Sequence, residues 1–251
     1  PTVNFVDTLT LSFRPVVDGQ VFSGDTLRVG EEPQEIAFEA AIGEGALRLV
    51  YTFDPDAYQV GFRVETPGTK LLDQGEASYD VTWDGALPFA EAAVDQEAIQ
   101  AGAYVNLGGE TDVLRLDEEG SIDDETRTGQ IDWVAVKTKF FVAAILPQEG
   151  TQTSGARLSG QQIGEATSDG FAQDYSATVE MPGLAENQAA AFTLYLGPVE
   201  LRRRAALDMY DVVDFGFGET ITRPISRDII APTLALLTSF IPSFGIAILV
   251  F

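Results

Sequence analysis

Short segments in which apolar and polar residues alternate recur along most of this chain. Within residues 47–53, Leu47, Leu49, Tyr51 and Phe53 would point to one side, and the residues between them to the other. A period of two places one face of a β-strand against a core, so each such segment predicts a strand. We expect about eleven strands, at residues 3–13, 36–38, 47–53, 58–64, 77–83, 103–107, 111–116, 133–146, 157–163, 174–181 and 190–196.

These strands, separated by Gly, Asp and Pro turns, predict a mainly β fold built as a large sandwich of antiparallel sheets. Residues 133–146 are ambiguous, because Lys137 and Lys139 fit either one face of a strand or one turn of a helix. The pattern changes at residues 197–198, and strong helix formers predict a helix over residues 199–210. We therefore divide the chain into a β domain at 1–197, a helix and connector at 198–228, and an apolar segment at 229–251.

The last 23 residues, 229–251, carry no charged side chain. A helix of that length could cross a bilayer core of about 30 Å. Pro232 and Pro242 interrupt the segment, which predicts a helix lying in the membrane interface and then the truncated start of a second, spanning helix. Arg223 and Arg227 favour membrane contact, because their side chains can reach lipid headgroups. The residues expected at the interface are Ile229, Ile230, Leu234, Leu237, Phe240, Ile241 and Phe244.

An alternative for the same segment is a helix buried in the core of the domain itself. Composition favours membrane contact over burial only slightly, since a buried helix and a membrane helix are both apolar. Arg223 and Arg227 could equally neutralise nearby acids, which abound in this chain.

The charge balance excludes one class of partner. The 39 acidic residues outnumber the 15 basic ones, for a net charge of −24. Such a surface repels phosphate, so we expect no nucleic-acid partner. Only three of the basic residues are lysines, which fits either a high-salt organism or an ordinary acidic surface outside the cytoplasm. Cysteine and histidine are absent, so disulfides, thiolate nucleophiles and Cys/His zinc sites are excluded.

No cluster of residues points to catalysis. The dense acidic run at residues 117–125 lacks the order of ligands in a calcium loop, so we interpret it as a solvated loop. No pair of carboxylates stands out, and neither a nucleophile-elbow nor a phosphate-loop motif occurs. We expect no enzymatic activity, metal or cofactor. Trp83 and Trp133 are interpreted as core residues.

Three consecutive arginines, Arg202, Arg203 and Arg204, allow two interpretations. They could bind anionic headgroups or an acidic surface of a partner. Alternatively, a helix would point them in different directions, where they would pair with Glu200 and Asp208. We prefer the pairing, and keep these arginines together with Arg223 and Arg227 as candidate contacts.

Several segments, in the same order, resemble the periplasmic region of YidC-type membrane protein insertases, especially the branch found in Bacteroidetes-like bacteria. Ala90 departs from the family pattern, which usually has Thr there. The matching segments are Tyr51-Thr52-Phe53 with Tyr58, WDGALPFAE at 83–91, WVAVKTKFFVAAIL at 133–146, FTLYLGP at 192–198, and residues 224–251.

The resemblance implies a β-supersandwich with the topology of sugar mutarotases and with C-terminal helices that lead to the membrane. It implies a periplasmic domain, tethered to the inner membrane as part of a multi-pass protein that inserts and folds membrane proteins. The implied partners are nascent membrane proteins, the membrane surface and Sec translocon components (SecDF and SecYEG). The start of the chain lacks the features of a signal peptide, so an export signal is expected upstream or removed. The alternative is a soluble β-sandwich that binds carbohydrate or another ligand.

Overall fold

The fold is given by a computed structural model. It describes residues 11–55, 57–70, 78–85, 87, 98–116, 123–167, 170–199, 233 and 236. The chain separates into two compact units, residues 1–204 and residues 205–251. All the strands of the described residues belong to the first unit, and every pairing between them is antiparallel.

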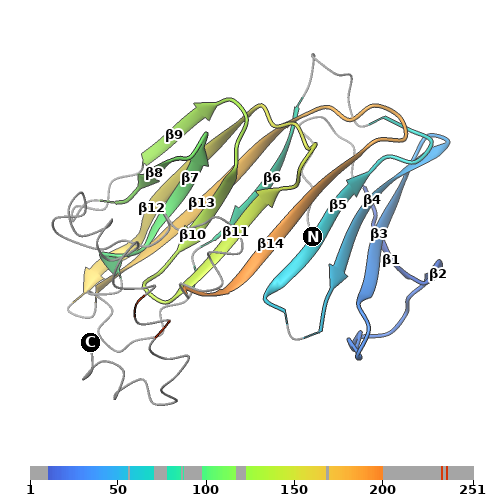
Figure 1. The fold of residues 1–251 in the computed structure, drawn as a ribbon, viewed down its shortest axis with the longest axis horizontal. Coiled ribbons are helices and arrows are strands. Elements are labelled where there is room, and N and C mark those ends of the chain that lie inside the picture. The colour runs from blue at the N-terminus through green and yellow to red at the C-terminus, as the bar shows by residue number, and fades with distance from the viewer. Residues whose placement is uncertain are drawn as a thin grey trace. The chain divides into compact units, whose positions relative to one another are not determined.

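The described strands form two sheets (Figure 1). The larger sheet has ten strands, in the order β2 (Gln20–Val21), β1 (Arg14–Val17), β3 (Gln34–Ile42), β4 (Gly45–Phe53), β5 (Gln59–Glu65), β14 (Ala189–Pro198), β11 (Phe141–Pro147), β10 (Trp133–Lys137), β7 (Gly102–Leu107) and β8 (Glu110–Leu114). The smaller sheet has four strands, in the order β6 (Ser78–Asp84), β13 (Gly170–Pro182), β12 (Gly155–Thr167) and β9 (Asp123–Thr128). This architecture confirms the prediction of a mainly β fold built from antiparallel sheets, and it is consistent with a sandwich.

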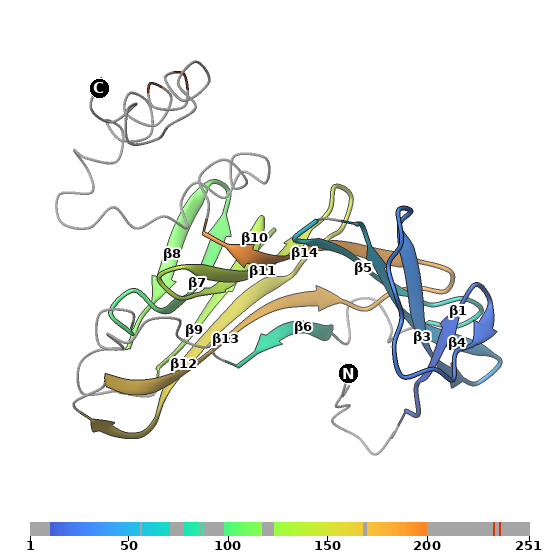
Figure 2. The ribbon, with the colours of Figure 1, turned by 90° about the horizontal axis from the view of Figure 1, so that it is seen from below.

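The smaller sheet packs against one end of the larger one. Strands β12 and β13 lie across β7 and β10, and β6 approaches β11 (Figure 2). The two sheets bury a shared apolar core between them, to which the larger sheet contributes Val105, Val134 and Ile145 and the smaller sheet Leu158 and Val179. Burial of this apolar surface is the main force that holds the sheets together.

The last strand of the described sheets occupies an interior position. β14 pairs with β5 on one side and with β11 on the other. It thereby joins the meander β1–β3–β4–β5 to the block β7–β8–β10–β11, because the described residues contain no other pairing between these two groups. The two halves of the ten-stranded sheet are therefore held together by strand pairing between residues that are far apart in sequence.

On one face of β3, β4 and β5, charged residues form a chain of ion pairs. Arg48 contacts Glu39 at 2.8 Å and Glu65 at 3.1 Å, and these three residues lie directly opposite one another on neighbouring strands. Arg63 contacts Glu65 at 3.0 Å and Glu35 at 2.9 Å. Such partly exposed networks stabilise a sheet only modestly. The ion pairs mark this face as the one away from the apolar core.

The predicted strands are largely confirmed, with informative differences. Residues 133–146 form not one element but the hairpin β10–β11. Residues 123–125, interpreted above as part of a loop, begin the edge strand β9. Residues 11–13 are described and are not a strand, whereas the rest of the predicted strand at 3–13 lies outside the described residues.

Two hairpin turns follow directly from their residues. Asp18 and Gly19 connect β1 to β2 with φ angles of 51° and 75°. Gly108 and Gly109 connect β7 to β8 with φ angles of 61° and 82°. Positive φ at both central residues matches the twist of antiparallel strands, and Gly or Asp adopts it at low cost.

The fold predicts that the stability of the domain depends strongly on one central aromatic ring. Phe192 of β14 is fully buried in the inter-sheet core. We expect Phe192→Ala to lower the free energy of unfolding by about 3–5 kcal/mol, since it removes a ring that surrounding residues cannot replace. Urea unfolding followed by tryptophan fluorescence measures this loss. The control is Val21→Ala on edge strand β2, whose side chain is 62% exposed; its effect should stay within about 0.5 kcal/mol. Equal losses in the two variants would contradict the assigned position of Phe192.

Candidate functional site

A row of apolar side chains crosses four strands of the larger sheet. Ile36 of β3 lies opposite Tyr51 of β4, Tyr51 opposite Phe62 of β5, and Phe62 opposite Phe192 of β14. The ring centroids are 4.9 Å apart between Tyr51 and Phe62, and 5.7 Å apart between Phe62 and Phe192. These spacings are favourable for aromatic pairs. Burial decreases along the row from β14 to β3: Phe192 and Phe62 are buried, whereas Tyr51 and Ile36 are partly exposed.

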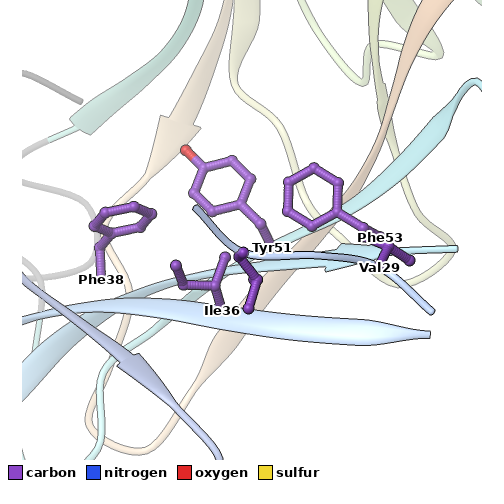
Figure 3. Close-up of a pocket in the computed structure, with 6 residues that line it drawn as sticks. Val29, Ile36, Phe38, Tyr51 and Phe53 are labelled. Atoms are coloured by element: carbon purple, nitrogen blue, oxygen red, sulfur yellow. The ribbon is translucent and has the colours of Figure 1, made fainter. Parts of the chain in front are cut away.

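A pocket of about 380 Å³ opens at the less buried end of this row. Its wall is almost entirely apolar and comes from β3, β4 and the segment between β2 and β3. Figure 3 shows the rings of Phe38, Tyr51 and Phe53 on one side of these strands, together with Ile36 and Val29. The residues that line the pocket are Leu27, Val29, Ile36, Phe38, Tyr51 and Phe53.

The alternation of residues along the strands produces this wall. Residues two apart on a strand share a face, so Ile36 and Phe38 project together, as do Tyr51 and Phe53. The rings of Phe38 and Tyr51 meet edge to face, with their centroids 6.0 Å apart. The ion-pair chain described above lies on the opposite face of the same strands. The pocket therefore lies on the face of β3 and β4 that continues the inter-sheet core.

The pocket offers an apolar surface with one polar group to a bound molecule. Among its six lining side chains, the only polar atom is the hydroxyl oxygen of Tyr51. Burial raises the pKa of Tyr51 above its ordinary value of 10.0, so the phenol stays protonated at neutral pH and can donate a hydrogen bond. Apolar pockets with one or two orienting polar groups are typical of binding sites.

The site residues predicted from the sequence lie outside the described residues. They are Arg202, Arg203, Arg204, Arg223, Arg227, Ile229, Ile230, Leu234, Leu237, Phe240, Ile241 and Phe244. In that region the structure describes two residues, Thr233 and Leu236; both are helical, and the Leu236 side chain is exposed. Among the described residues, no helix has the length and apolar character needed to cross a bilayer.

The two tryptophans have structural positions. Trp133 on β10 is buried. Trp83 on β6 is half-buried, and its indole N–H donates a hydrogen bond to the carbonyl oxygen of Gly85 at 3.0 Å. Their interpretation as core residues rather than binding platforms agrees with these positions.

Sequence reasoning missed the pocket. Leu47, Leu49, Tyr51 and Phe53 were correctly placed on one face of their strand, but nothing in the alternation reveals that one end of this face is open. A usable signal was the concentration of rings at Phe38, Tyr51 and Phe53, on strands that are neighbours in the chain. Three aromatic rings on adjacent strands could have indicated an aromatic surface on this part of the sheet.

Fold and pocket together define a class: an antiparallel two-sheet β domain with an apolar pocket on one face of the larger sheet. Comparison with known proteins gives the family. The family model for the YidC periplasmic domain matches residues 16–227. This chain therefore belongs to the family of YidC periplasmic domains, and the domain is periplasmic.

Curated relatives named membrane protein insertase YidC match most of this chain. The membrane protein insertase YidC of Chlorobium luteolum is 33% identical over 233 residues, which cover 90% of this chain and 39% of the relative. The protein of the same name from Chlorobium limicola is 30% identical over 252 residues, covering 98% of this chain and 41% of the relative. The chain thus spans about two fifths of the length of these relatives.

A search of solved structures found a heparan sulfate lyase, HepC from Pedobacter heparinus. The similarity has a TM-score of 0.35 and 10% sequence identity, and covers 74% of this chain and 24% of the lyase. At this level the similarity supports no conclusion about fold or activity.

The partly buried phenol of Tyr51 predicts how the stability of the domain changes in alkali. In the unfolded chain a tyrosine releases its proton near pH 10, whereas burial keeps Tyr51 protonated to higher pH in the folded protein. The free energy of unfolding should therefore fall as pH rises above about 10, by up to about 1.4 kcal/mol per pH unit for each such group. Burial also raises the pKa of Tyr79 and Tyr175.

The Tyr51→Phe variant should lose the Tyr51 share of that fall and keep the share of the other two tyrosines. Urea unfolding at a series of pH values from neutral to alkaline measures the slope for each protein. Tyr58→Phe is the matched control, because the Tyr58 ring is exposed. If Tyr51→Phe and the unmodified chain have the same slope, Tyr51 is not buried as described.

Proposed function

We propose that this domain is the periplasmic accessory and interaction domain of an inner-membrane protein insertase. The whole protein would insert and fold membrane proteins, alone or beside the Sec translocon. The observation that carries this proposal is the family match across residues 16–227, together with relatives that are named membrane protein insertases. The domain itself has no catalytic role in this proposal.

The proposal extends to the architecture beyond the described strands. It takes the two sheets to be a β-supersandwich of mutarotase-like topology, followed by helices that lead to the membrane. The apolar segment 229–251 would lie first in the interface and then enter the bilayer. The arginines at 202–204, 223 and 227 would contact headgroups or an acidic partner.

The apolar pocket has a role in this proposal as a transient binding surface for nascent membrane proteins. Membrane proteins expose long apolar segments before they enter the bilayer, and these segments aggregate in water. A wall of aromatic and aliphatic side chains with one hydrogen-bond donor can hold an apolar side chain without selecting a sequence. The pocket connects to the rigid core through the row that ends at Phe192, so its shape is preorganised.

A carbohydrate-binding sandwich is the runner-up, and the wall of the pocket disfavours it. Sugar hydroxyls need polar partners when they leave water, and a site that lacks them loses affinity. The six lining residues supply only the hydroxyl of Tyr51. The partners proposed are therefore nascent membrane proteins and the membrane surface. Sec components (SecDF or SecYEG) are included because the proposed insertase works beside the translocon.

The function is tested by complementation. The full-length protein that contains this chain is produced in a bacterial strain whose own insertase is depleted. We expect it to restore insertion of a reporter membrane protein, measured by the accessibility of a periplasmic loop to protease. A variant of the full-length protein with residues 11–199 deleted shows what this domain contributes. Failure of the intact, membrane-localised protein to restore insertion would count against the proposed function.

The role of the pocket has its own prediction. A photo-crosslinking amino acid is placed at Phe53 in the full-length protein, during synthesis of a model membrane protein. We expect adducts with the nascent chain, because Phe53 lines the pocket. The same amino acid at Val21, exposed on edge strand β2, is the control and should give few adducts. Adding Ile36→Asp places a carboxylate in the wall and should reduce the adducts from Phe53. Equal yields from Phe53 and Val21 would sink the assignment.

A further inference from the structure

Exposed aromatic side chains gather at one end of the larger sheet. Among the side chains whose exposure the structure describes, three aromatic ones are exposed: Tyr58 at 43%, Phe140 at 37% and Phe141 at 44%. Leu196, with 39% of its side chain exposed, lies beside them. We define the exit rim as these four residues together with Lys139.

Backbone hydrogen bonds hold the members of the exit rim together, although they come from three separate segments. The amide of Leu196 on β14 donates to the carbonyl oxygen of Tyr58 at 2.9 Å. The amide of Val199 donates to the carbonyl oxygen of Phe140 at 2.7 Å. Phe141, the first residue of β11, lies directly opposite the last residue of β14. Figure 1 shows β14 ending beside the turn that joins β10 to β11.

The rings of the exit rim also have defined positions. The ring of Tyr58 packs so closely over Gly197 that a Cβ at that position would lie 2.9 Å from the ring. The ammonium nitrogen of Lys139 lies 4.9 Å from the centroid of the Phe140 ring, at the distance of a cation–π contact. The exit rim therefore gathers its residues at one end of the sheet, with the Tyr58 ring over Gly197 on one face of β14 and with Leu196 and Phe141 on the other face.

The chemistry of the exit rim matches one kind of partner. Exposed apolar clusters are costly in water and usually mark contact surfaces. Tyrosine and other aromatic rings, joined by lysine side chains that reach toward phosphate, are the residues that gather at the boundary between lipid and water. Moreover, the described part of β14 ends in the exit rim, and the chain continues from there toward the uncharged residues 229–251. The part of the domain nearest in sequence to the proposed membrane segments is thus the part that carries the exposed rings.

We propose that the exit rim dips into the headgroup zone of the lipid bilayer and fixes the orientation of the domain on the membrane. This inference rests on the proposed function, because that function tethers the domain to the membrane. The net charge of −24 opposes attraction to an anionic bilayer. Partitioning of the rings therefore provides the contact, and Lys139 meets a headgroup phosphate. The proposal is made for a zwitterionic bilayer surface.

The test uses the full 251-residue chain and vesicles of phosphatidylcholine whose acyl chains are brominated close to the headgroups. Bromine quenches tryptophan fluorescence only at short range. Phe140→Trp places a reporter in the exit rim, and Val21→Trp places one on edge strand β2 as the matched control. Quenching of Trp83 and Trp133, measured in the unmodified chain, is subtracted. We expect the Phe140→Trp reporter to be quenched at least about twofold more strongly than the Val21→Trp reporter.

Further variants separate a specific contact from general adsorption. Phe141→Ser with Tyr58→Ser, added to Phe140→Trp, should reduce the excess quenching; equal melting temperatures would show that the fold is retained. Equal quenching of the two reporters, or none, overturns the proposal. The proposal is also overturned if the emission of the Phe140→Trp variant shifts with protein concentration in the absence of lipid. The exit rim would then be a contact between two copies of the chain. If only the exit-rim proposal is wrong, the excess quenching is missing but complementation is still observed. If the proposed function is wrong, complementation fails while the quenching result is unaffected.

Discussion

The contact between neighbouring side chains in the row Ile36, Tyr51, Phe62 and Phe192 is the interaction on which the rest of the domain depends. It runs across β3, β4 and β5 to β14, the strand whose pairing with β11 joins the two groups of strands among the described residues. At its buried end the row belongs to the core between the sheets, and at its other end it forms the wall of the pocket. The core and the wall of the pocket therefore share one row of side chains. A change that loosens the row is expected to act on both.

Local alternation was sufficient to predict most strands, because one face of each strand is buried and the other is not. It was not sufficient for residues 133–137, all of which are buried. Val134 and Val136 contribute to the inter-sheet core, whereas Lys137 lies on the other face, 5.2 Å from the centroid of the Tyr104 ring. A strand buried on both faces loses its period of two and resembles a helix in sequence. Strand β9 was missed for the opposite reason, since all six of its residues are polar or charged.

The candidate site was less predictable than the fold. The apolar face of β4 looks the same in sequence whether another sheet covers it or not. Coverage depends on where β12 and β13 lie, which is decided by contacts between distant residues that no local pattern encodes. The family resemblance, in contrast, was recognisable from ordered short motifs, and one of them, Tyr51-Thr52-Phe53, supplies two rings of the pocket wall. Two rings of the pocket wall therefore belong to a segment that carries the family resemblance, although the sequence does not show that they line a pocket. The predicted membrane contacts stay predictions, because those residues lie outside the described ones.

The position of β14 has a consequence for how the domain is made. A periplasmic chain crosses the membrane progressively, and β1 to β13 emerge from the export channel before β14 if export starts at the N-terminus. Until then β5 and β11 each have an unpaired edge, and exposed edges of this kind are prone to pair with other chains. The larger sheet can be completed only once β14, the last of its strands along the chain, has emerged. The domain thus reaches its native state only when nearly all of it has been exported, which links the completion of its fold to the progress of translocation.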